Sequence, residues 1–178
     1  MAGLLYSTNS GIGWAGNEVL PGTSNRTTDP AVAFDLGGNA YFHYLDQGKP
    51  FVQKSTDGGI TWQSPVIISS SITSDKGHIA IDNTAGPFNN NIYIAYTDFN
   101  SEIGVNIKFA RSTNGGNSFE APIDISNVIN TYDAIGVNLA VGSNGEVYAV
   151  WAIGDDANLD SEGIGFNKST DGGETWQT

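Results

Sequence analysis

The sequence of 178 residues contains no cysteine. It therefore has no disulfide framework and no thiolate chemistry, and it does not indicate a redox compartment. Basic residues are scarce as well: seven Lys and Arg stand against 19 Asp and Glu, for a net charge of −12. Such a surface repels phosphate groups, so we expect neither nucleic acid nor an anionic membrane as a partner.

Long apolar runs and helical periodicity are also missing. No apolar run approaches the roughly 20 residues that a membrane helix needs, and the first six residues lack the basic region and apolar core of a signal peptide. Period-two alternation and β-branched or aromatic runs occur throughout, whereas no window sustains apolar spacing of about 3.6 residues. The chain is therefore predicted to be all-β.

One eight-residue phrase occurs four times, which predicts a repeat protein. The copies read STNSGIGW, STDGGITW, STNGGNSF and STDGGETW, and they begin at Ser7, Ser55, Ser112 and Ser169. The serines are 48, 57 and 57 residues apart (7 to 55, 55 to 112, 112 to 169). Periods of roughly 40 to 57 residues are typical of β-propellers and other arrays.

Each repeat holds three strand-like segments before the phrase and one after it, as at 29–35, 40–44, 50–54 and 62–69. Four antiparallel strands make one propeller blade. We predict a single set of about three blades over 1–178: a half blade at 1–20, blades at 29–70 and 75–126, and a blade at 133–178 that lacks most of its last strand.

Strand edges at the two ends of this set would be open. An open edge invites pairing with other strands, so we expect either a longer chain or a homo-oligomer. Two copies of the chain would carry strands for about six blades, which is a normal ring size. The set is thus predicted to be a partial ring or half of a six-bladed ring.

The repeated phrase suits a tight turn. Gly58 and Gly59 accept left-handed backbone angles, Asp57 can accept backbone N–H groups, and Trp62 can bury a large ring. A residue used once in chemistry need not recur in every blade, whereas one that closes a hairpin must. We therefore interpret Asp57 and its counterpart Asp171 as structural rather than catalytic.

The pattern Ser-x-Asp-x-Gly-x-Thr-Trp resembles the Asp-box, or bacterial neuraminidase repeat, of the sialidase-like β-propeller superfamily. The copies at Ser55 and Ser169 match it fully. The Ser112 copy carries Asn, Ser and Phe substitutions, and the Ser7 copy keeps only Ser, Asn, Gly and Trp. The resemblance covers essentially the whole chain and implies the fold. It does not fix the activity, because Asp-boxes occur in sialidases, other glycosidases, lectins and receptors.

The resemblance implies that the Asp-box turns lie on one rim of the propeller, the box rim, and that ligands bind at the opposite rim. The opposite-rim loops carry mostly acids: Asp29, Asp46, Asp75, Asp98, Glu102, Asp133, Asp155, Asp156, Asp160 and Glu162. Sialidases of this kind hold the substrate carboxylate with three arginines. This chain has two, and Arg111 directly precedes a box, so only Arg26 could serve.

Three aspartates are candidate catalytic residues. Asp29, Asp75 and Asp133 each stand where a first strand begins, so we expect equivalent places in three blades. They either hold the loops that cross between blades or supply paired carboxylates to a cation or sugar. Tyr132 is a further candidate by its place beside Asp133, although the family's nucleophilic Tyr cannot be mapped onto it by a motif.

The predicted ligand-binding residues are Arg26, His78, Asp98 and Glu102, all on opposite-rim segments. The alternative for Arg26 is a solvated arginine paired with Asp29. His43 alternates within a strand and is predicted to be a packed or edge residue.

One acidic loop offers oxygen ligands at alternate positions, which suits calcium. Its predicted ligands are Asp156, Asn158, Asp160 and Glu162. A merely solvated acidic loop is the alternative, and no other cofactor is expected.

Three functions remain open from the sequence. The first is a secreted or cell-surface sialidase-like module that recognises a glycan or small molecule without catalysis. The second is a fragment or subunit of a glycoside hydrolase whose site is completed elsewhere. The third is a scaffold for protein contacts.

Overall fold

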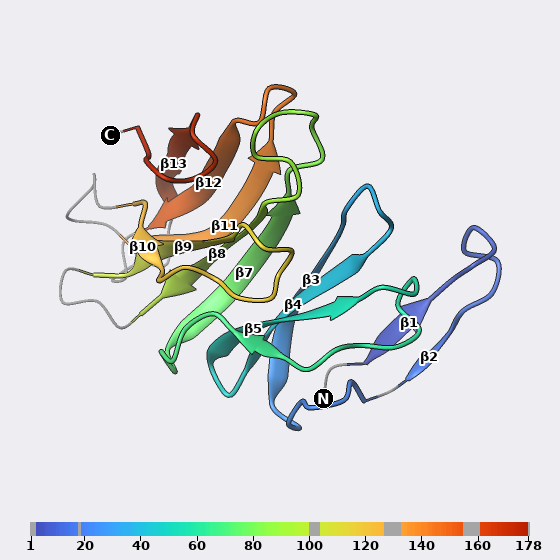
Figure 1. The fold of residues 1–178 in the computed structure, drawn as a ribbon. Coiled ribbons are helices and arrows are strands. Elements are labelled where there is room, and N and C mark those ends of the chain that lie inside the picture. The colour runs from blue at the N-terminus through green and yellow to red at the C-terminus, as the bar shows by residue number, and fades with distance from the viewer. Residues whose placement is uncertain (1–2, 18, 100–103, 127–132, 155–160, 178) are drawn as a thin grey trace.

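The computed structural model describes residues 3–17, 19–99, 104–126, 133–154 and 161–177. Every regular element in these ranges is a β-strand, and none of the described residues forms a helix that could cross a membrane. Four antiparallel sheets follow one another along an arc (Figure 1). The prediction of an all-β partial propeller is confirmed.

The sheets follow the chain order. The first pairs β1 (Leu4–Tyr6) with β2 (Ala15–Asn17). The second contains β3 (Thr27–Phe34), β4 (Ala40–Asp46), β5 (Lys49–Ser55) and β6 (Val66–Ile67). The third contains β7 (Ser74–Ile81), β8 (Ile92–Asp98), β9 (Asn106–Ser112) and β10 (Ile123–Asp124). The fourth contains β11 (Asp133–Val141), β12 (Val147–Gly154) and β13 (Ser161–Ser169). We call the second, third and fourth sheets blades 1, 2 and 3, and the first sheet the half blade.

The fourth strands are shorter than the sequence predicts. We expect strands at 62–69 and 119–125, whereas β6 and β10 contain two residues each. Pro65 and Pro122 lie just before these strands. A proline has no N–H to donate to a ladder. Before the prolines, single hydrogen bonds from Gln63 N to the Lys54 carbonyl and from Glu120 N to the Arg111 carbonyl reach the third strand, and the regular ladder begins only after them.

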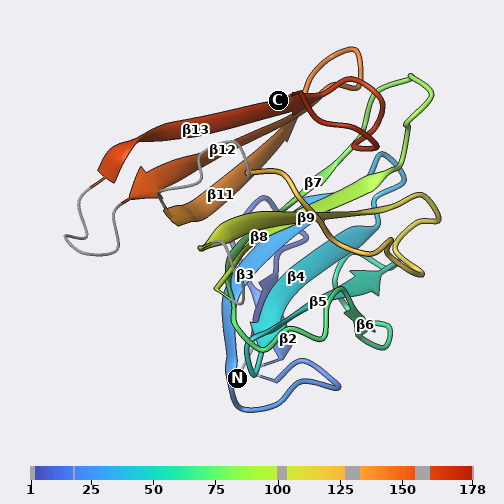
Figure 2. The ribbon, with the colours of Figure 1, turned by 90° about the vertical axis from the view of Figure 1, so that its left-hand side faces the viewer.

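The first strands of the three blades lie side by side at the inner edge of the arc. β7 packs between β3 and β11, and in Figure 2 the sheet of β11, β12 and β13 extends to the upper left of the other sheets. This arrangement brings the starts of β3, β7 and β11 to one rim. The Asp-box turns, which follow β5, β9 and β13, therefore lie at the other rim.

The core consists of apolar layers between neighbouring sheets. In β8, Ile92, Ile94 and Tyr96 pack toward blade 1, and Tyr93 and Ala95 pack toward blade 3. Both faces of the strand are buried, which is why it reads as a continuous apolar run rather than an alternating one. A smaller layer joins the half blade to blade 1.

Candidate functional site

The four Asp-box turns share one backbone conformation. Two consecutive residues of each turn have positive φ, from 58° at Ser10 to 91° at Gly59. Glycine adopts such angles without steric cost, and the first box places Ser10 there instead of glycine. The divergent first copy therefore keeps the geometry of the other three.

The Asp57 carboxylate is surrounded by donors from its own turn. Its Oδ1 accepts hydrogen bonds from Ser55 Oγ (2.8 Å) and Thr61 N (2.9 Å), and its Oδ2 accepts one from Thr61 Oγ (2.5 Å). The hydrogen bonds from Thr61, followed by that from Ser55, lower the pKa of Asp57 to about 2.

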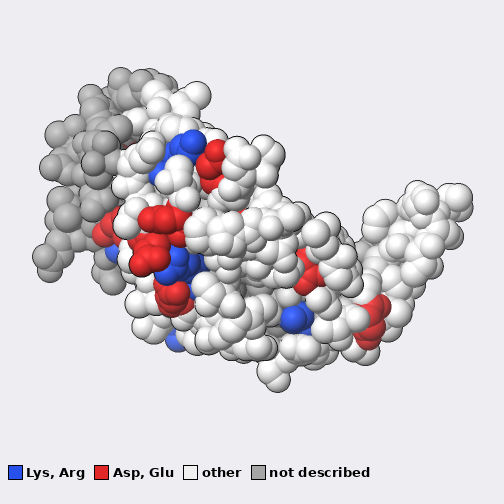
Figure 3. Space-filling model, turned by 45° about the horizontal axis from the view of Figure 1, so that its top comes forward, with Lys and Arg blue, Asp and Glu red and all other residues white. Residues whose placement is uncertain are grey.

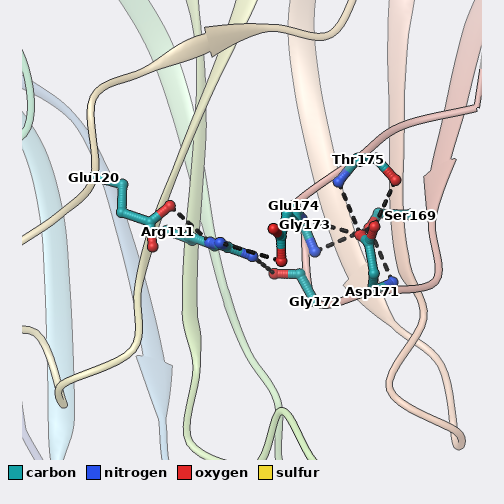
Figure 4. Close-up of polar contacts among 8 residues, drawn as sticks. All are labelled: Arg111, Glu120, Ser169, Asp171, Gly172, Gly173, Glu174 and Thr175. Carbon is teal, nitrogen blue, oxygen red and sulfur yellow. Dashed lines mark hydrogen bonds and ion pairs between the residues drawn. The ribbon is translucent and has the colours of Figure 1, made fainter.

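Asp171 repeats this arrangement in the last box (Figure 4). Burial alone would raise the pKa of Asp171, but the hydrogen bonds from Thr175, Ser169 and the Glu174 N–H outweigh it and hold the pKa at about 2. A carboxylate committed to closing its own turn is poorly placed to serve as an acid or base. The geometry thus supports the structural interpretation of the boxes.

Arg111 joins two blades beside the last box. It contacts Glu120 through Nε (2.8 Å), the Gly172 carbonyl through Nη1 (3.3 Å) and Glu174 through Nη2 (3.8 Å), as Figure 4 shows. A cavity of about 120 Å³ adjoins these groups. It is lined by Phe109, Ala110, Arg111, Glu120, Ala121, Ile123, Gly173 and Glu174.

Glu120 and Glu174 offset the positive charge of Arg111 in this cavity. On the face in Figure 3, basic and acidic side chains likewise lie next to one another and form no separate patches. Because its charge is already paired, Arg111 offers little to an anionic ligand. The sequence does carry a signal for this contact: Lys54, Arg111 and Lys168 each stand directly before a box serine.

The strand register overturns the predicted equivalence of the three aspartates. Three hairpin pairs occupy matching places: Phe34–Ala40, Ile81–Ile92 and Val141–Val147. They match because Ala40, Ile92 and Val147 each pair with a box serine in the third strand. Counting back from these pairs, the counterparts of Asp29 are Lys76 and Gly136.

Asp75 thus lies one residue before Lys76, and Asp133 lies three residues before Gly136. Neither aspartate is the counterpart of Asp29. Each first strand contains a bulge, and the irregularities fall between Thr28 and Ala31, between Asp75 and Gly77, and between Ile135 and Asn138. Each bulge adds one residue, so the three strands stay in step, and the offset appears once the hairpin pairs show where each first strand ends.

Asp29 lies in the bulge of β3 with a φ of 52° and a half-buried side chain. A left-handed conformation is uncommon outside glycine, although Asp tolerates it better than most residues. Bulges often redirect a side chain next to functional sites. Asp29 is therefore the aspartate among the three candidates whose backbone is held in an unusual conformation.

His43 lies beneath this bulge and is fully buried. Its Nδ1–H donates to the Phe51 carbonyl at 2.9 Å, and its Nε2 faces the backbone of Gly77 without a hydrogen-bond partner. Burial lowers the pKa of His43 to about 4; the Phe51 hydrogen bond and the Asp29 charge oppose this shift, and His78 adds to it. The imidazole is neutral at pH 7, and its predicted packed position agrees with this burial.

His78 in β7 is half buried. Its Nδ1 accepts a hydrogen bond from Leu139 N at 3.3 Å, which leaves Nε2 to carry the proton of the neutral ring. Burial, followed by the charge of Lys76, lowers the pKa of His78. His78 lies in the middle of β7 and not at its opening, where the sequence predicts it, whereas Asp29 lies in the bulge of β3.

Other opposite-rim acids hold the segments that cross between blades. Asp98 is buried and accepts hydrogen bonds from Ser71 Oγ and Thr73 Oγ, each at 3.1 Å. Asp46 accepts hydrogen bonds from the backbone N–H and hydroxyl of Ser24. These acids anchor the chain just before β7 and β3.

Asp133 accepts a hydrogen bond from Val105 N at 3.2 Å, which links β11 to the segment before β9. Arg26 is exposed and forms no ion pair with Asp29 within the described ranges, and Asp75 is also exposed. The ligand-binding and catalytic roles assigned to these residues stay predictions.

Several predicted residues lie outside the described part of the chain: Glu102, Tyr132, Asp156, Asn158 and Asp160. Glu162 belongs to β13, but its side chain is not described. Among the residues that are described, no group of three His, Asp or Glu side chains could hold a metal ion. The calcium site therefore remains a prediction.

Comparison with solved structures places this fold among propeller enzymes. The Hadza microbial sialidase Hz136 matches with a TM-score of 0.60 and 18% identity over 86% of this chain and 37% of its own. NanB sialidase from Streptococcus pneumoniae matches with a TM-score of 0.58 and 16% identity over 88% and 25%. An endo-arabinase from Bacteroides thetaiotaomicron matches with a TM-score of 0.61 and 16% identity over 90% and 56%.

At these identities the likeness shows the fold alone, and the chain spans only part of each of these structures. No family model matches the chain, and no curated protein matches it. The sialidase-like propeller fold is thus established, whereas membership of an Asp-box family stays a prediction from the residues.

Proposed function

We propose that this chain is a propeller module that recognises an uncharged glycan at its opposite rim and does not itself catalyse hydrolysis. The observation that carries the proposal is the bulge of β3, where Asp29 is held with a φ of 52° and its charge acts on His43, which in turn interacts with His78. A carboxylate and a neutral imidazole supply the acceptor and donor that sugar hydroxyls need.

The charge of the chain argues against an anionic sugar. The net charge is −12, and the single arginine outside the box rim, Arg26, is exposed. Binding of a sugar carboxylate would call for converging guanidinium groups. A neutral glycan carries no charge for this acidic protein to repel.

Several of the described acids at the opposite rim are not free for catalysis. Glycoside hydrolysis uses two carboxylates on either side of the scissile bond, and Asp98, Asp46 and Asp133 already accept hydrogen bonds from the crossing segments. We therefore expect binding without turnover.

The test is a glycan array with neutral and sialylated glycans, combined with hydrolysis assays on a fluorogenic sialoside. Asp29→Gly is the decisive variant, because the equivalent position in blade 3 is Gly136 and glycine suits the backbone angle. We expect at least a tenfold loss of binding with an unchanged unfolding midpoint. Glu174→Gln removes an acid from the box rim and should bind normally.

Turnover of the sialoside would contradict the non-catalytic proposal. Silence in both assays would favour a scaffold for protein contacts instead. If Asp29→Gly binds as tightly as the parent chain, the β3 bulge is not the binding site.

A second candidate is part of a glycoside hydrolase whose remaining groups lie elsewhere. It is favoured by the match to the Hz136 sialidase and the endo-arabinase, of which the chain covers 37% and 56%. Calcium binding by the acidic loop at 155–163 belongs to either candidate and is tested by titration with Ca²⁺.

We further propose an extracellular or cell-surface location, because the composition is rich in Gly, Asn, Ser and Thr and the proposed ligand is a glycan.

A further inference from the structure

Blades 1 and 2 meet at one titratable contact between their strands. The His43 ring in β4 lies so close to the backbone of Gly77 in β7 that a methyl group at Gly77 would be 2.1 Å from His43 Nε2. His43 is 0% exposed, and its Nε2 has no hydrogen-bond partner among the described residues. A buried polar atom without a partner costs free energy. The contact therefore places a polar group where an apolar one would cost less.

The next interface packs the same place without a titratable group. Counted from the matching hairpin pairs, the counterparts of His43 and Gly77 between blades 2 and 3 are Ala95 and Val137. Both are 0% exposed and belong to one apolar core. A small residue and a larger one thus replace a large residue and a glycine. Packing alone does not require a histidine at this position.

The contact accommodates His43 only in its neutral form. Its Nδ1–H donates to the Phe51 carbonyl in β5, so a second proton would be carried by Nε2. There the new N–H would face the Gly77 backbone without an acceptor. A buried charge without a partner is strongly unfavourable, and burial accordingly lowers the pKa of His43 to about 4.

The groups around His43 come from three strands. Asp29 on β3 favours the protonated ring, because its carboxylate attracts the positive charge. His78 on β7 disfavours it, and the charge of Lys76 acts on His78 in turn. β5 contributes the uncharged Phe51 carbonyl. Asp29 is therefore the carboxylate that a proton on His43 would attract.

The backbone of Asp29 can change without breaking a strand pair. Asp29 lies in the bulge of β3, two residues before Ala31, which pairs with His43. The bulge leaves Asp29 outside the regular ladder. Its φ of 52° belongs to a sparsely populated region for residues other than glycine. A new partner for its carboxylate can therefore shift this segment to other backbone angles.

We propose that His43 is an acid-sensitive switch: a proton on Nε2 draws the Asp29 carboxylate from the opposite rim toward the imidazolium, and the β3 bulge rearranges with it. The new ion pair supplies the acceptor that the Gly77 backbone lacks. The consequence for binding rests on the proposed function, since a glycan held by Asp29 would be released in acid. The conformational change itself needs no ligand.

NMR spectroscopy of the ligand-free chain tests the switch. As pH falls from about 7 to about 3.5, we expect the Asp29 Cα signal and the Ala31 amide signal to shift with the same midpoint as the His43 imidazole. The double variant His43→Ala, Gly77→Val copies the apolar pair of the next interface. In this variant the Ala31 amide should lose most of its shift, and the Asp29 Cα signal should follow only its own carboxyl group.

Two single variants separate the charge of Asp29 from that of the rim. Asp29→Asn removes the carboxylate that attracts the imidazolium, so the midpoint of His43 should fall. Asp75→Asn removes an exposed acid from the same rim and should leave the midpoint unchanged.

An unchanged His43 midpoint in Asp29→Asn would overturn the proposal, and so would an Ala31 amide that does not follow His43. Loss of all folded signals at the His43 midpoint would overturn it as well, because global unfolding would then replace the local change. None of these outcomes depends on glycan binding, which the array tests separately.

Discussion

The two rims of this molecule differ in regularity. At the box rim, four turns share a pair of residues with φ between 58° and 91°, and two blade interfaces share one cation-to-carbonyl contact. At the opposite rim, the matching bulge position holds Asp29 in blade 1, Lys76 in blade 2 and Gly136 in blade 3. The box rim thus repeats from blade to blade, whereas the opposite rim varies.

This difference separates stability from recognition. A contact needed to stack one blade on the next must recur at every interface, whereas a site that binds one ligand needs each group only once. The box rim should therefore tolerate few substitutions. The opposite rim should change ligand binding with little effect on unfolding.

The largest effect is expected at a box glycine that faces a neighbouring blade. Gly173→Ala forces a side chain to a φ of 82° and places its methyl group 2.5 Å from the Phe109 ring. We expect a loss of about 2 to 4 kcal/mol in the free energy of unfolding, measured by urea denaturation. Gly58→Ala has nothing within 4 Å and a φ of 74°, and should lose only about 1 kcal/mol. Equal losses would show that interface packing adds nothing.

An intermediate effect is expected from His43, which is buried below the opposite rim. Its pKa is about 4 in the folded chain and about 6.5 when unfolded, so the unfolded state binds more protons between these values. Stability should therefore fall as pH drops from 6.5 to 4, by about 3 kcal/mol at most.

His43→Leu should flatten most of this slope, because the matching residues Ala95 and Val150 in the other blades are apolar. In this variant the lowered pKa of His78 still makes the free energy of unfolding depend on pH, but with a smaller slope. Urea denaturation at pH 4.5, 5.5 and 6.5 measures it. Parallel pH profiles for the two proteins would contradict a buried neutral His43.

The smallest effect is expected from the charges of the box carboxylates. Asp57 and Asp171 have pKa values of about 2, below the ordinary 3.8, so their contribution is present above pH 3.8 and lost as pH falls toward 2. The double variant Asp57→Asn, Asp171→Asn should lose less thermal stability between pH 4 and pH 2 than the parent chain.

Asn is the matched replacement because Asn114 in the box of blade 2 already accepts the equivalent hydrogen bonds. A double variant with the parent profile would indicate that these carboxylates contribute nothing through their charge.

Local rules explain what could be predicted. The box turns follow from residues such as Gly58, which favours positive φ, and from Asp57, whose partners lie within four residues. The strands follow from period-two patterns. The short β6 and β10 were less predictable, because the effect of Pro65 on pairing depends on the neighbouring strand.

The sequence by itself determined the repeat, the all-β class and the scarcity of arginine, because these depend on residue type and spacing alone. Only the tertiary structure decided which acids already accept hydrogen bonds from other segments and which have a strained backbone conformation. Asp98 accepts a hydrogen bond from Ser71, and the hairpin pairs that end β3 and β7 align Asp29 with Lys76 and not with Asp75. Pairing register and contacts between distant segments arise from packing, which no count along the chain can supply.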